Sequence, residues 1–314
     1  MSEGDRTEYS KIEEEDDDLK LPADTLALLQ DFQQTQSSKL AMFEKMQKRA
    51  EARFDAIGTD GFSFDDEEVE KAEDDDDGEG EGEDEEGEGE EALKSMEIFT
   101  EDWNLSQFWY TDETAHRLSA YLLEPLVKLG KYGSDDYETV EGYESKDDLR
   151  IAILSAPTVH QYLTRVILPK LPKGVSKKVH AVVFEHDTRF AVFGPKQFVH
   201  YDFNAPMRIP AAVKERFDSV LVDPPFLSEE CQVKTAITVR LLLRKPSEED
   251  AAKGRSRPRV AVCTGQKVAD VILRTYRGYG VRCTDFRPEH RNGLQNEFRC
   301  FASEAVEGVW GFEE

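Results

Sequence analysis

Between residues 149 and 303 the sequence alternates short apolar runs with longer stretches that have helical spacing. Runs such as AVVF and SVLV are apolar at every position, which is typical of strands covered on both faces. This alternation favours a parallel sheet with helices packed on both sides. The expected strands are 149–155, 178–185, 198–203, 217–223, 259–265, 281–286 and 296–303, and the expected helices between them are 156–166, 211–216, 229–244 and 267–276.

The last two expected strands, 281–286 and 296–303, are separated by a loop that shows no helical spacing. A parallel pair needs a crossover of about a dozen residues or more, so these two strands should be antiparallel. The sequence therefore predicts an α/β fold with a doubly wound, mostly parallel seven-stranded sheet that ends in an antiparallel C-terminal strand pair.

Charge divides the chain into parts. The formal net charge of the 314 residues is -26, of which residues 1–20 carry -6 and residues 65–91 carry -18. Self-repulsion and glycines in the second tract prevent a packed core there. We therefore expect the following parts: a disordered acidic tail (1–20), an N-terminal helical segment (21–57), a disordered acidic linker (58–95) and one folded, nearly neutral domain (96–314).

The folded domain should begin with a long helix. Thr111 is a candidate N-cap, and apolar residues at helical spacing continue through Leu126 toward a stop at Gly130. The polar residues 131–148 are expected to form a loop, and the polar residues 245–258 an insertion between a helix and a strand.

Several classes of protein are disfavoured. The sequence contains no apolar run of the roughly 18–20 residues that a membrane helix needs, so we expect no membrane partner. The acidic start MSEGDRTEYS does not resemble a signal peptide, so we expect a cytoplasmic protein. The four cysteines form no C-x-x-C and the six histidines lack ligand spacing. We therefore expect free, mostly buried thiols and no metal site.

The sharpest motif is Asp223-Pro224-Pro225-Phe226, directly after an expected buried strand. In doubly wound sheets, ligands bind beyond the carboxyl ends of the strands. Proline has no amide donor, so the backbone must leave the sheet there along a fixed path. The motif would present a carboxylate, free carbonyls and an aromatic ring, which together could orient an amine nucleophile. The alternative is an ordinary turn at the end of a strand.

The junction after the first strand lacks the glycine-rich turn of nucleotide-binding folds. This absence disfavours NAD or ATP more than S-adenosylmethionine, which carries no phosphate and whose carboxylate suits a helix N-terminus. The candidate residues for binding such a cofactor at this junction are Ser155, Ala156, Pro157 and Thr158.

Two acids end the next two expected strands. Glu185 could accept hydrogen bonds from ribose hydroxyls, and Asp202 from an adenine amino group. Each acid taken alone is better explained as an ordinary charge at a strand end. Their occurrence at consecutive strands, together with the motif at Asp223, favours a binding site.

Three aromatic residues, Phe108, Trp109 and Tyr110, precede the expected long helix. Side chains of three consecutive residues cannot all point into one core. At least one should face a pocket or a partner, and Trp109 and Tyr110 are candidates for the wall of a substrate channel. The alternative is that the three rings only pack the start of the helix.

These motifs resemble those of the eukaryotic elongation factor 1A lysine methyltransferases, a family formerly described as N6-adenine methyltransferases because of the D-P-P-F/Y motif. D-P-P-aromatic alone also occurs in nucleic-acid amino-methyltransferases, but the segments in this order are specific. The resemblance covers residues 22–35 and about 99–302. The segments are PADTLALLQDF (22–32), NLSQFWY (104–110), SAPTV (155–159), FEHDTRF (184–190), DPPFLSEEC (223–231) and NEFRCF (296–301).

The resemblance implies a class I methyltransferase-type fold, S-adenosyl-L-methionine as cofactor, and methylation of a lysine of elongation factor 1A by a monomeric, cytoplasmic enzyme. It implies that Glu185 binds the ribose, that residues 155–158 form a degenerate donor loop, and that Asp202 contacts the adenine edge. Asp223, Pro224, Pro225 and Phe226 match the acceptor-amine motif. The acidic tract, the loop 131–148 and the insertion 245–258 depart from a compact family member, but none of them falls on a motif.

Two other functions stay open. A DNA or RNA adenine methyltransferase needs a basic surface and room for a flipped base. The charge of -2 outside the acidic tracts argues against a stable nucleic-acid partner. A non-catalytic, methyltransferase-like binding subunit would explain the missing glycine loop, but the intact motif at Asp223 argues against it.

Overall fold

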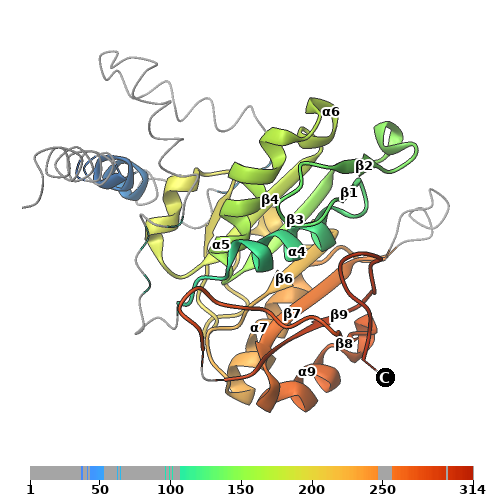
Figure 1. Cartoon of the computed structure of the whole chain (residues 1–314). Coiled ribbons are helices and arrows are strands. Elements are labelled where there is room, and N and C mark those ends of the chain that lie inside the picture. Colours follow the sequence, from blue (N-terminus) through green and yellow to red (C-terminus); the bar gives the residue numbers. More distant parts are fainter. Residues whose placement is uncertain are drawn as a thin grey trace, which may run out of the picture.

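Figure 1 shows a computed structural model of the chain. The structure describes residues 107–246, 257–294 and 296–313, together with residues 37, 41, 43–52, 62, 64, 96, 99 and 101. The predictions for the acidic tail 1–20, for the acidic tract 65–91 and for most of the remaining N-terminal residues lie outside the described residues. The insertion 245–258 is described only at its two ends.

The core is a seven-stranded sheet in the order β5-β4-β3-β6-β7-β9-β8. The first five of these strands are parallel, and β9 runs antiparallel to both β7 and β8. This arrangement confirms the predicted class I methyltransferase-type sheet with its antiparallel C-terminal pair. The strands are β3 (Leu149–Leu154), β4 (Val179–Glu185), β5 (Phe198–His200), β6 (Ser219–Val222), β7 (Arg259–Gly265), β8 (Arg282–Cys283) and β9 (Phe298–Ala302).

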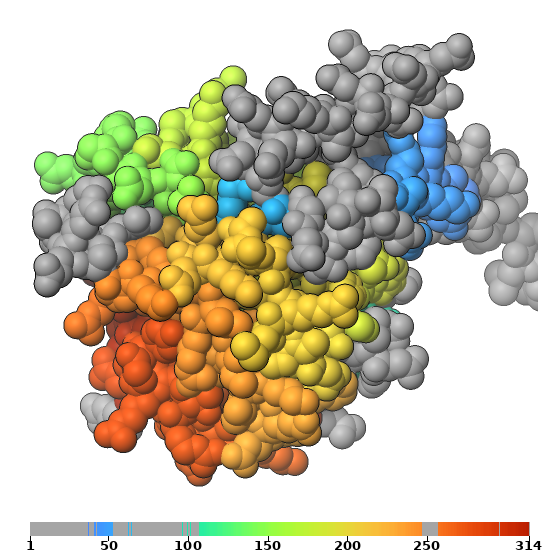
Figure 2. All heavy atoms as spheres, turned by 180° about the vertical axis from the view of Figure 1, so that it is seen from behind, coloured from blue at the N-terminus to red at the C-terminus, as the bar shows by residue number. Residues whose placement is uncertain are grey.

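Helices cover both faces of the sheet (Figure 1). One face carries α4 (Asp112–Leu123) and α5 (Pro157–Gln161), which continues as a π-helix over Tyr162–Ile167. The opposite face carries α7 (Glu229–Leu242) and α9 (Ala269–Thr275), which adjoin each other when seen from behind (Figure 2). The shorter helical turns are Tyr143–Ser145, Leu168–Lys170, α6 (Lys173–Ser176), Thr188–Phe193, Ala211–Val213, Gln266–Val268 and Arg277–Tyr279.

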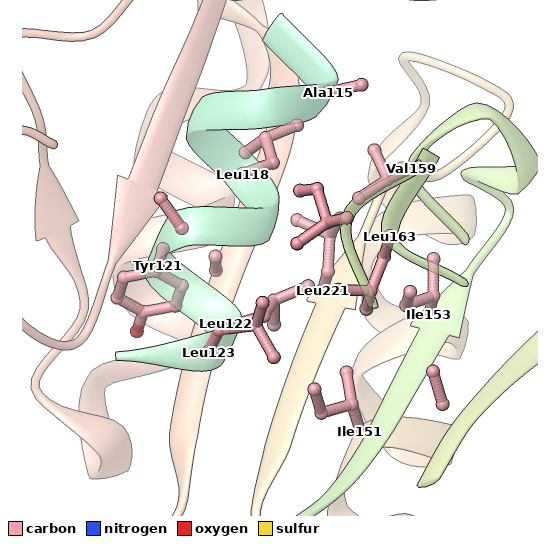
Figure 3. Close-up of a cluster of buried hydrophobic side chains, with 14 of the residues drawn as sticks. Ala115, Leu118, Tyr121, Leu122, Leu123, Ile151, Ile153, Val159, Leu163 and Leu221 are labelled. Carbon is pink, nitrogen blue, oxygen red and sulfur yellow. The ribbon is translucent and has the colours of Figure 1, made fainter. Parts of the chain in front are cut away.

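Side chains of β3 alternate between the two faces, as the period of a strand requires. Ile151 and Ile153 belong to the cluster beneath α4 and α5, together with Leu221 of β6 (Figure 3). Ala152 and Leu154 belong to the cluster beneath α7 and α9. Because both faces of β3 are buried, its sequence is apolar at nearly every position.

The prediction of a helix from Thr111 to Gly130 is wrong in its second half. Thr111 caps α4 as expected, but the helix ends at Leu123, just before Pro125. Proline cannot donate the backbone hydrogen bond that a continuing helix requires. The chain instead forms β1 (Val127–Leu129), which pairs antiparallel with β2 (Tyr137–Thr139). The expected loop 131–148 therefore contains a strand and a short helical turn.

All the expected strands except 259–265 are shorter than predicted. The third, β5, ends at His200, so Asp202 lies two residues beyond the strand and does not end it. The segment 281–286 contributes only Arg282–Cys283 to the sheet. The fourth strand begins at Ser219, because Phe217 forms an isolated bridge with Leu243 instead.

Part of the N-terminal segment packs on the domain. Residues 43–52 are helical, and the ring of Phe43 contacts that of Phe99 edge-on at 4.9 Å. Phe99 stacks on Phe190, which lies in the connection between β4 and β5. Within the described residues, the helical segment thus packs beside one end of the parallel sheet.

The cysteines agree with the sequence analysis: all four are free, and three of them are buried. Within the described residues, no helix combines the length and the apolar character that crossing a membrane would require.

Candidate active site

The carboxyl ends of β3, β4 and β6 open into a cavity of about 490 Å³, a size typical of small-molecule sites. Every site residue predicted from the sequence lines it, including the four of the D-P-P-F motif and the four of the first junction. The lining residues are Gln107, Phe108, Trp109, Tyr110, Ser155, Ala156, Pro157, Thr158, Glu185, His186, Tyr201, Asp202, Phe203, Asn204, Asp223, Pro224, Pro225, Phe226, Leu227, His290, Leu294, Asn296 and Phe298.

The junction after β3 makes its tight turn without glycine. Ser155 has a φ of 54°, in the left-handed region that non-glycine residues seldom adopt. Its backbone amide donates to the carbonyl of Phe184 at 2.9 Å, which ties the turn to β4. Pro157 then occupies the start of α5. Strain of this kind costs on the order of 1–3 kcal/mol and tends to collect at functional sites.

The D-P-P-F turn is held from two sides. The Asp223 amide donates to the carbonyl of Leu154 on β3 at 3.0 Å, which fixes where the chain leaves the sheet. Gln232 of α7 is buried and donates through Nε2 to the carbonyl of Phe226 at 2.9 Å. The same nitrogen lies 3.3 Å from Oγ1 of Thr264 on β7.

A close approach completes this packing. A Cβ atom on Gly265, at the end of β7, would lie 2.9 Å from methyl carbons of Leu227. Glycine therefore lets the residue after the motif sit against the sheet. Ser228 follows and caps α7 by accepting from the amide of Cys231. The motif is thus a fixed corner between β6 and α7.

Glu185 presents a buried carboxyl at the end of β4. Its Oε1 accepts from the amides of His186 at 2.9 Å and Asp187 at 3.4 Å, which fixes the orientation of the group. Burial raises the pKa of Glu185 to about 7, and the two backbone hydrogen bonds only partly oppose this shift.

Asp223 shares the same cavity. Burial raises its pKa to about 7, the Tyr110 hydroxyl opposes this shift, and the negative charge of Glu185 adds to it. No lysine or arginine is among the described residues that line the cavity. Arg189, outside the cavity lining, only partly offsets the raised pKa of Glu185. Two carboxyl groups in such a cavity resist simultaneous ionisation, and a cationic ligand would allow both to ionise. The cavity therefore favours a positively charged group over a phosphate.

A buried polar network connects the segment before α4 to β4. Gln107 donates through Nε2 to Oδ2 of Asp187 at 2.9 Å, and its Oε1 accepts from Arg189 at 3.0 Å. Burial opposes ionisation of Asp187, but hydrogen bonds from Arg189 and Gln107 keep its pKa below the ordinary value. The network holds the aromatic residues 108–110 beside Glu185.

Aromatic side chains form much of the wall. The ring of Tyr110 lies 4.6 Å from that of His290, which packs edge-on against Phe298 at 4.7 Å. Phe226 is 41% exposed and lies 5.5 Å from Phe203.

Trp109 has a mainly supporting position in this wall. It is 5% exposed, its indole N–H donates to the carbonyl of Phe99, and its ring packs against Phe190.

Sequence reasoning missed several lining residues. Four of them lie inside segments that carried the family resemblance: Gln107, His186, Asn296 and Phe298. The sequence pointed to these segments but not to a role for these residues. The loop between β8 and β9 contributes His290 and Leu294, for which no motif gave a signal. Tyr201, Phe203 and Asn204 follow β5 beside the predicted Asp202.

The raised pKa of Glu185 predicts an effect on stability. Because the folded pKa lies above the unfolded one, ionisation of Glu185 destabilises the unliganded protein as pH rises from about 4.5 to about 7. Glu185→Gln keeps the backbone hydrogen bonds and should raise the free energy of unfolding at pH 8 by on the order of 1–3 kcal/mol. At pH 4 the gain should vanish.

Denaturant unfolding of the two proteins at both pH values measures this effect. Glu230→Gln on α7 removes an exposed carboxyl and should give no gain at pH 8. A Glu185→Gln protein no more stable than the wild type at pH 8 would show that the carboxyl ionises without cost.

The chain that forms this cavity is similar in sequence to a known protein family and to several known proteins. Residues 101–305 match the family model described as "Probable N6-adenine methyltransferase". The chain is 39% identical over 211 residues to Protein-lysine N-methyltransferase EFM5 of Saccharomyces cerevisiae, a match that covers 67% of this chain and 75% of that protein.

Two further relatives have related names. The match to human EEF1A lysine methyltransferase 1 is 34% over 211 residues and covers 66% of this chain and 76% of that protein. The match to Protein-lysine N-methyltransferase CG9154 of Drosophila melanogaster is 30% over 291 residues and covers 92% of this chain and 95% of that protein. The chain therefore belongs to the family of protein-lysine N-methyltransferases that includes EFM5 and EEF1A lysine methyltransferase 1.

Proposed function

We propose that the protein methylates a lysine side chain of translation elongation factor 1A with S-adenosyl-L-methionine as the methyl donor. The observation that carries the proposal is the cavity in which Asp223 and Glu185 face a space lined by aromatic rings and, within the described part, by no lysine or arginine. A sulfonium and an amine are the groups that such a cavity suits. The substrate is inferred from the names of relatives such as human EEF1A lysine methyltransferase 1.

The residues around the cavity fit the proposed cofactor. S-adenosyl-L-methionine supplies an electrophilic methyl group on a positively charged sulfur. Glu185 is assigned to the ribose hydroxyls, Asp202 to the adenine amino group, and the turn 155–158 to the amino-acid end. Oδ1 of Asp202 accepts a hydrogen bond from the backbone amide of Asn204 at 2.8 Å. The other carboxylate oxygen is therefore the one assigned to the adenine amino group.

The acceptor amine needs a fixed direction and the loss of a proton. At pH 7 only about one lysine in a few thousand is uncharged. Burial in the cavity lowers the pKa of the amine, whereas the Asp223 carboxylate raises it. We therefore assign Asp223 and the Pro224 carbonyl to orienting the N–H bonds, with the proton leaving through water. Alignment supplies most of the rate.

The remaining residues of the motif shape the path of the lysine. Pro225 keeps the corner rigid, and Phe226 stands at the mouth, where its ring can lie along the methylene chain. Tyr110 and, behind it, Trp109 complete the channel wall. As part of the same proposal, the domain 96–314 is the catalytic unit and acts as a monomer in the cytoplasm.

One observation favours a second function. The matched family model carries the description of an N6-adenine methyltransferase. An adenine acceptor brings phosphates with it, and the described residues of the cavity lining include no lysine or arginine to bind them. A binding subunit without activity would have no need of the acid at Asp223. Lysine transfer is therefore the function that the site supports best.

Incubation of the pure protein with methyl-labelled S-adenosyl-L-methionine separates these functions. We expect label on a lysine of elongation factor 1A, identified by mass spectrometry, and none on adenine-containing DNA or RNA oligonucleotides. Label on adenine alone would support the second function. Label on neither, with the cofactor bound, would support the binding subunit.

Asp223→Ala should reduce methyl transfer by at least about 100-fold, because the amine loses its aligning carboxylate. Cofactor affinity, measured by calorimetry, should stay within a few-fold of the wild type. Asp270→Ala, which removes an exposed acid of α9, is the matched control and should leave both quantities unchanged. A loss of cofactor affinity as large as the loss of activity would contradict the role assigned to Asp223.

A further inference from the structure

One polar group in the cavity wall has no hydrogen bond of ordinary distance and angle. The side chain of Tyr110 is 1% exposed, and no group among the described residues makes a hydrogen bond of that geometry with its hydroxyl. A buried hydroxyl without a partner costs about 1–3 kcal/mol. Such groups are uncommon in folded proteins, so the position of this hydroxyl calls for a function.

The backbone holds Tyr110 firmly in place. It forms an isolated antiparallel bridge with His290. On either side, the Thr111 amide donates to the Glu289 carbonyl at 2.9 Å and the Arg291 amide donates to the Trp109 carbonyl at 2.8 Å. The His290 ring packs against the phenol ring at a tilt of 33°. The hydroxyl is therefore held at a fixed point in the wall.

Two groups that act on this hydroxyl could accept a hydrogen bond from it: the Asp223 carboxyl, which lines the same cavity, and the Cys263 thiol of β7. Burial, followed by the influence of Cys300, raises the pKa of Cys263 well above its ordinary value, so this sulfur stays protonated and is a weak acceptor. A carboxylate is a much stronger acceptor for a phenol. Asp223 is therefore the natural partner of Tyr110.

We propose that Tyr110 is a positioning residue whose hydroxyl donates a hydrogen bond to Asp223 and so keeps that carboxylate ionised and directed at the acceptor amine. The direction toward the amine rests on the proposed function, whereas the pairing of the two side chains does not. The interaction with Tyr110 lowers the pKa of the Asp223 carboxyl. This direction agrees with a hydrogen bond donated by the hydroxyl to the carboxylate.

The other titratable groups around Asp223 have separate effects. Glu185 faces it across the cavity and raises its pKa, but Tyr110 is not among the groups that shift Glu185. His290, behind the phenol, has a pKa lowered to about 4 by burial and is neutral at pH 7. Cys263 is neutral as well. Tyr110 also lowers the pKa of Cys263, but that thiol stays neutral with or without the hydroxyl. Removal of the Tyr110 hydroxyl should therefore change the ionisation of Asp223 and not that of the other groups.

The test is a titration of the Asp223 carboxyl by carbon-13 NMR in the full-length, unliganded protein, with Asp223→Asn identifying the signal. Tyr110→Phe should raise the pKa of Asp223 by about one unit, because the ionised form loses a donor. Tyr110→3-fluorotyrosine makes the phenol a stronger donor and should lower the same pKa.

Tyr276→Phe is the matched control. Tyr276 is also 1% exposed with an unpartnered hydroxyl, but it lies in the cluster beneath α7 and α9 and does not line the cavity. It should leave the Asp223 titration unchanged. A pKa of Asp223 that stays the same in both Tyr110 variants, or moves in the same direction in both, would overturn the proposal. If Tyr110→Phe fails to fold, the fluorinated variant alone decides.

The pH dependence of activity tests the link to the amine. With saturating cofactor, the acid limb of kcat/KM for elongation factor 1A should move upward by about one pH unit in Tyr110→Phe. Near the limb this corresponds to a loss of up to about tenfold at fixed pH, which should be regained at higher pH. If the NMR titration shifts but the pH profile of activity does not, Tyr110 pairs with Asp223 without helping it to orient the amine, which would contradict that part of the proposal. A wild type that transfers no methyl group refutes the proposed function, and the NMR titration still decides the pairing.

Discussion

The structure depends on one constraint: two carboxyl groups share a cavity that, among the described residues, is lined by no lysine or arginine. Burial raises the pKa values of Glu185 and Asp223 to about 7, and the charge of Glu185 makes ionisation of Asp223 harder. Such a pair destabilises a marginally stable protein, so its presence is best explained by a positively charged ligand that offsets the cost of ionising the two carboxyl groups. The family to which the chain belongs uses ligands of that charge, a methyl donor and a lysine.

The rest of the fold holds this pair in place. Parallel strands β4 and β6 lie on either side of β3, so their carboxyl ends bring Glu185 and Asp223 to the same edge of the sheet. Gln107 and Gln232 then fix the surroundings from outside the sheet, one through Asp187 and the other through the Phe226 carbonyl. Both glutamines are buried and hydrogen-bonded, which makes the cavity wall rigid before any ligand binds.

The sheet and much of the cavity could be predicted from the sequence because each signal was local. Strands covered on both faces are apolar throughout, and two prolines after such a strand mark where the chain must leave it. The hairpin β1–β2 was missed because Leu126 and its apolar neighbours fit a helical spacing equally well, and only Pro125 indicated the end of α4. The partners of Tyr110 could not be predicted, since His290 reaches it from a loop almost two hundred residues away whose position depends on the antiparallel end of the sheet.

Above all, the cavity should bind a cation beside its two carboxyl groups. Calorimetry of S-adenosyl-L-methionine binding at pH 6.5, in buffers of different ionisation enthalpy, measures the protons exchanged on binding. We predict a net release of protons, because the sulfonium favours the ionised carboxylates, and a smaller release with S-adenosylhomocysteine, which lacks that charge. Binding of both ligands with no release of protons, or with equal release, would contradict the account.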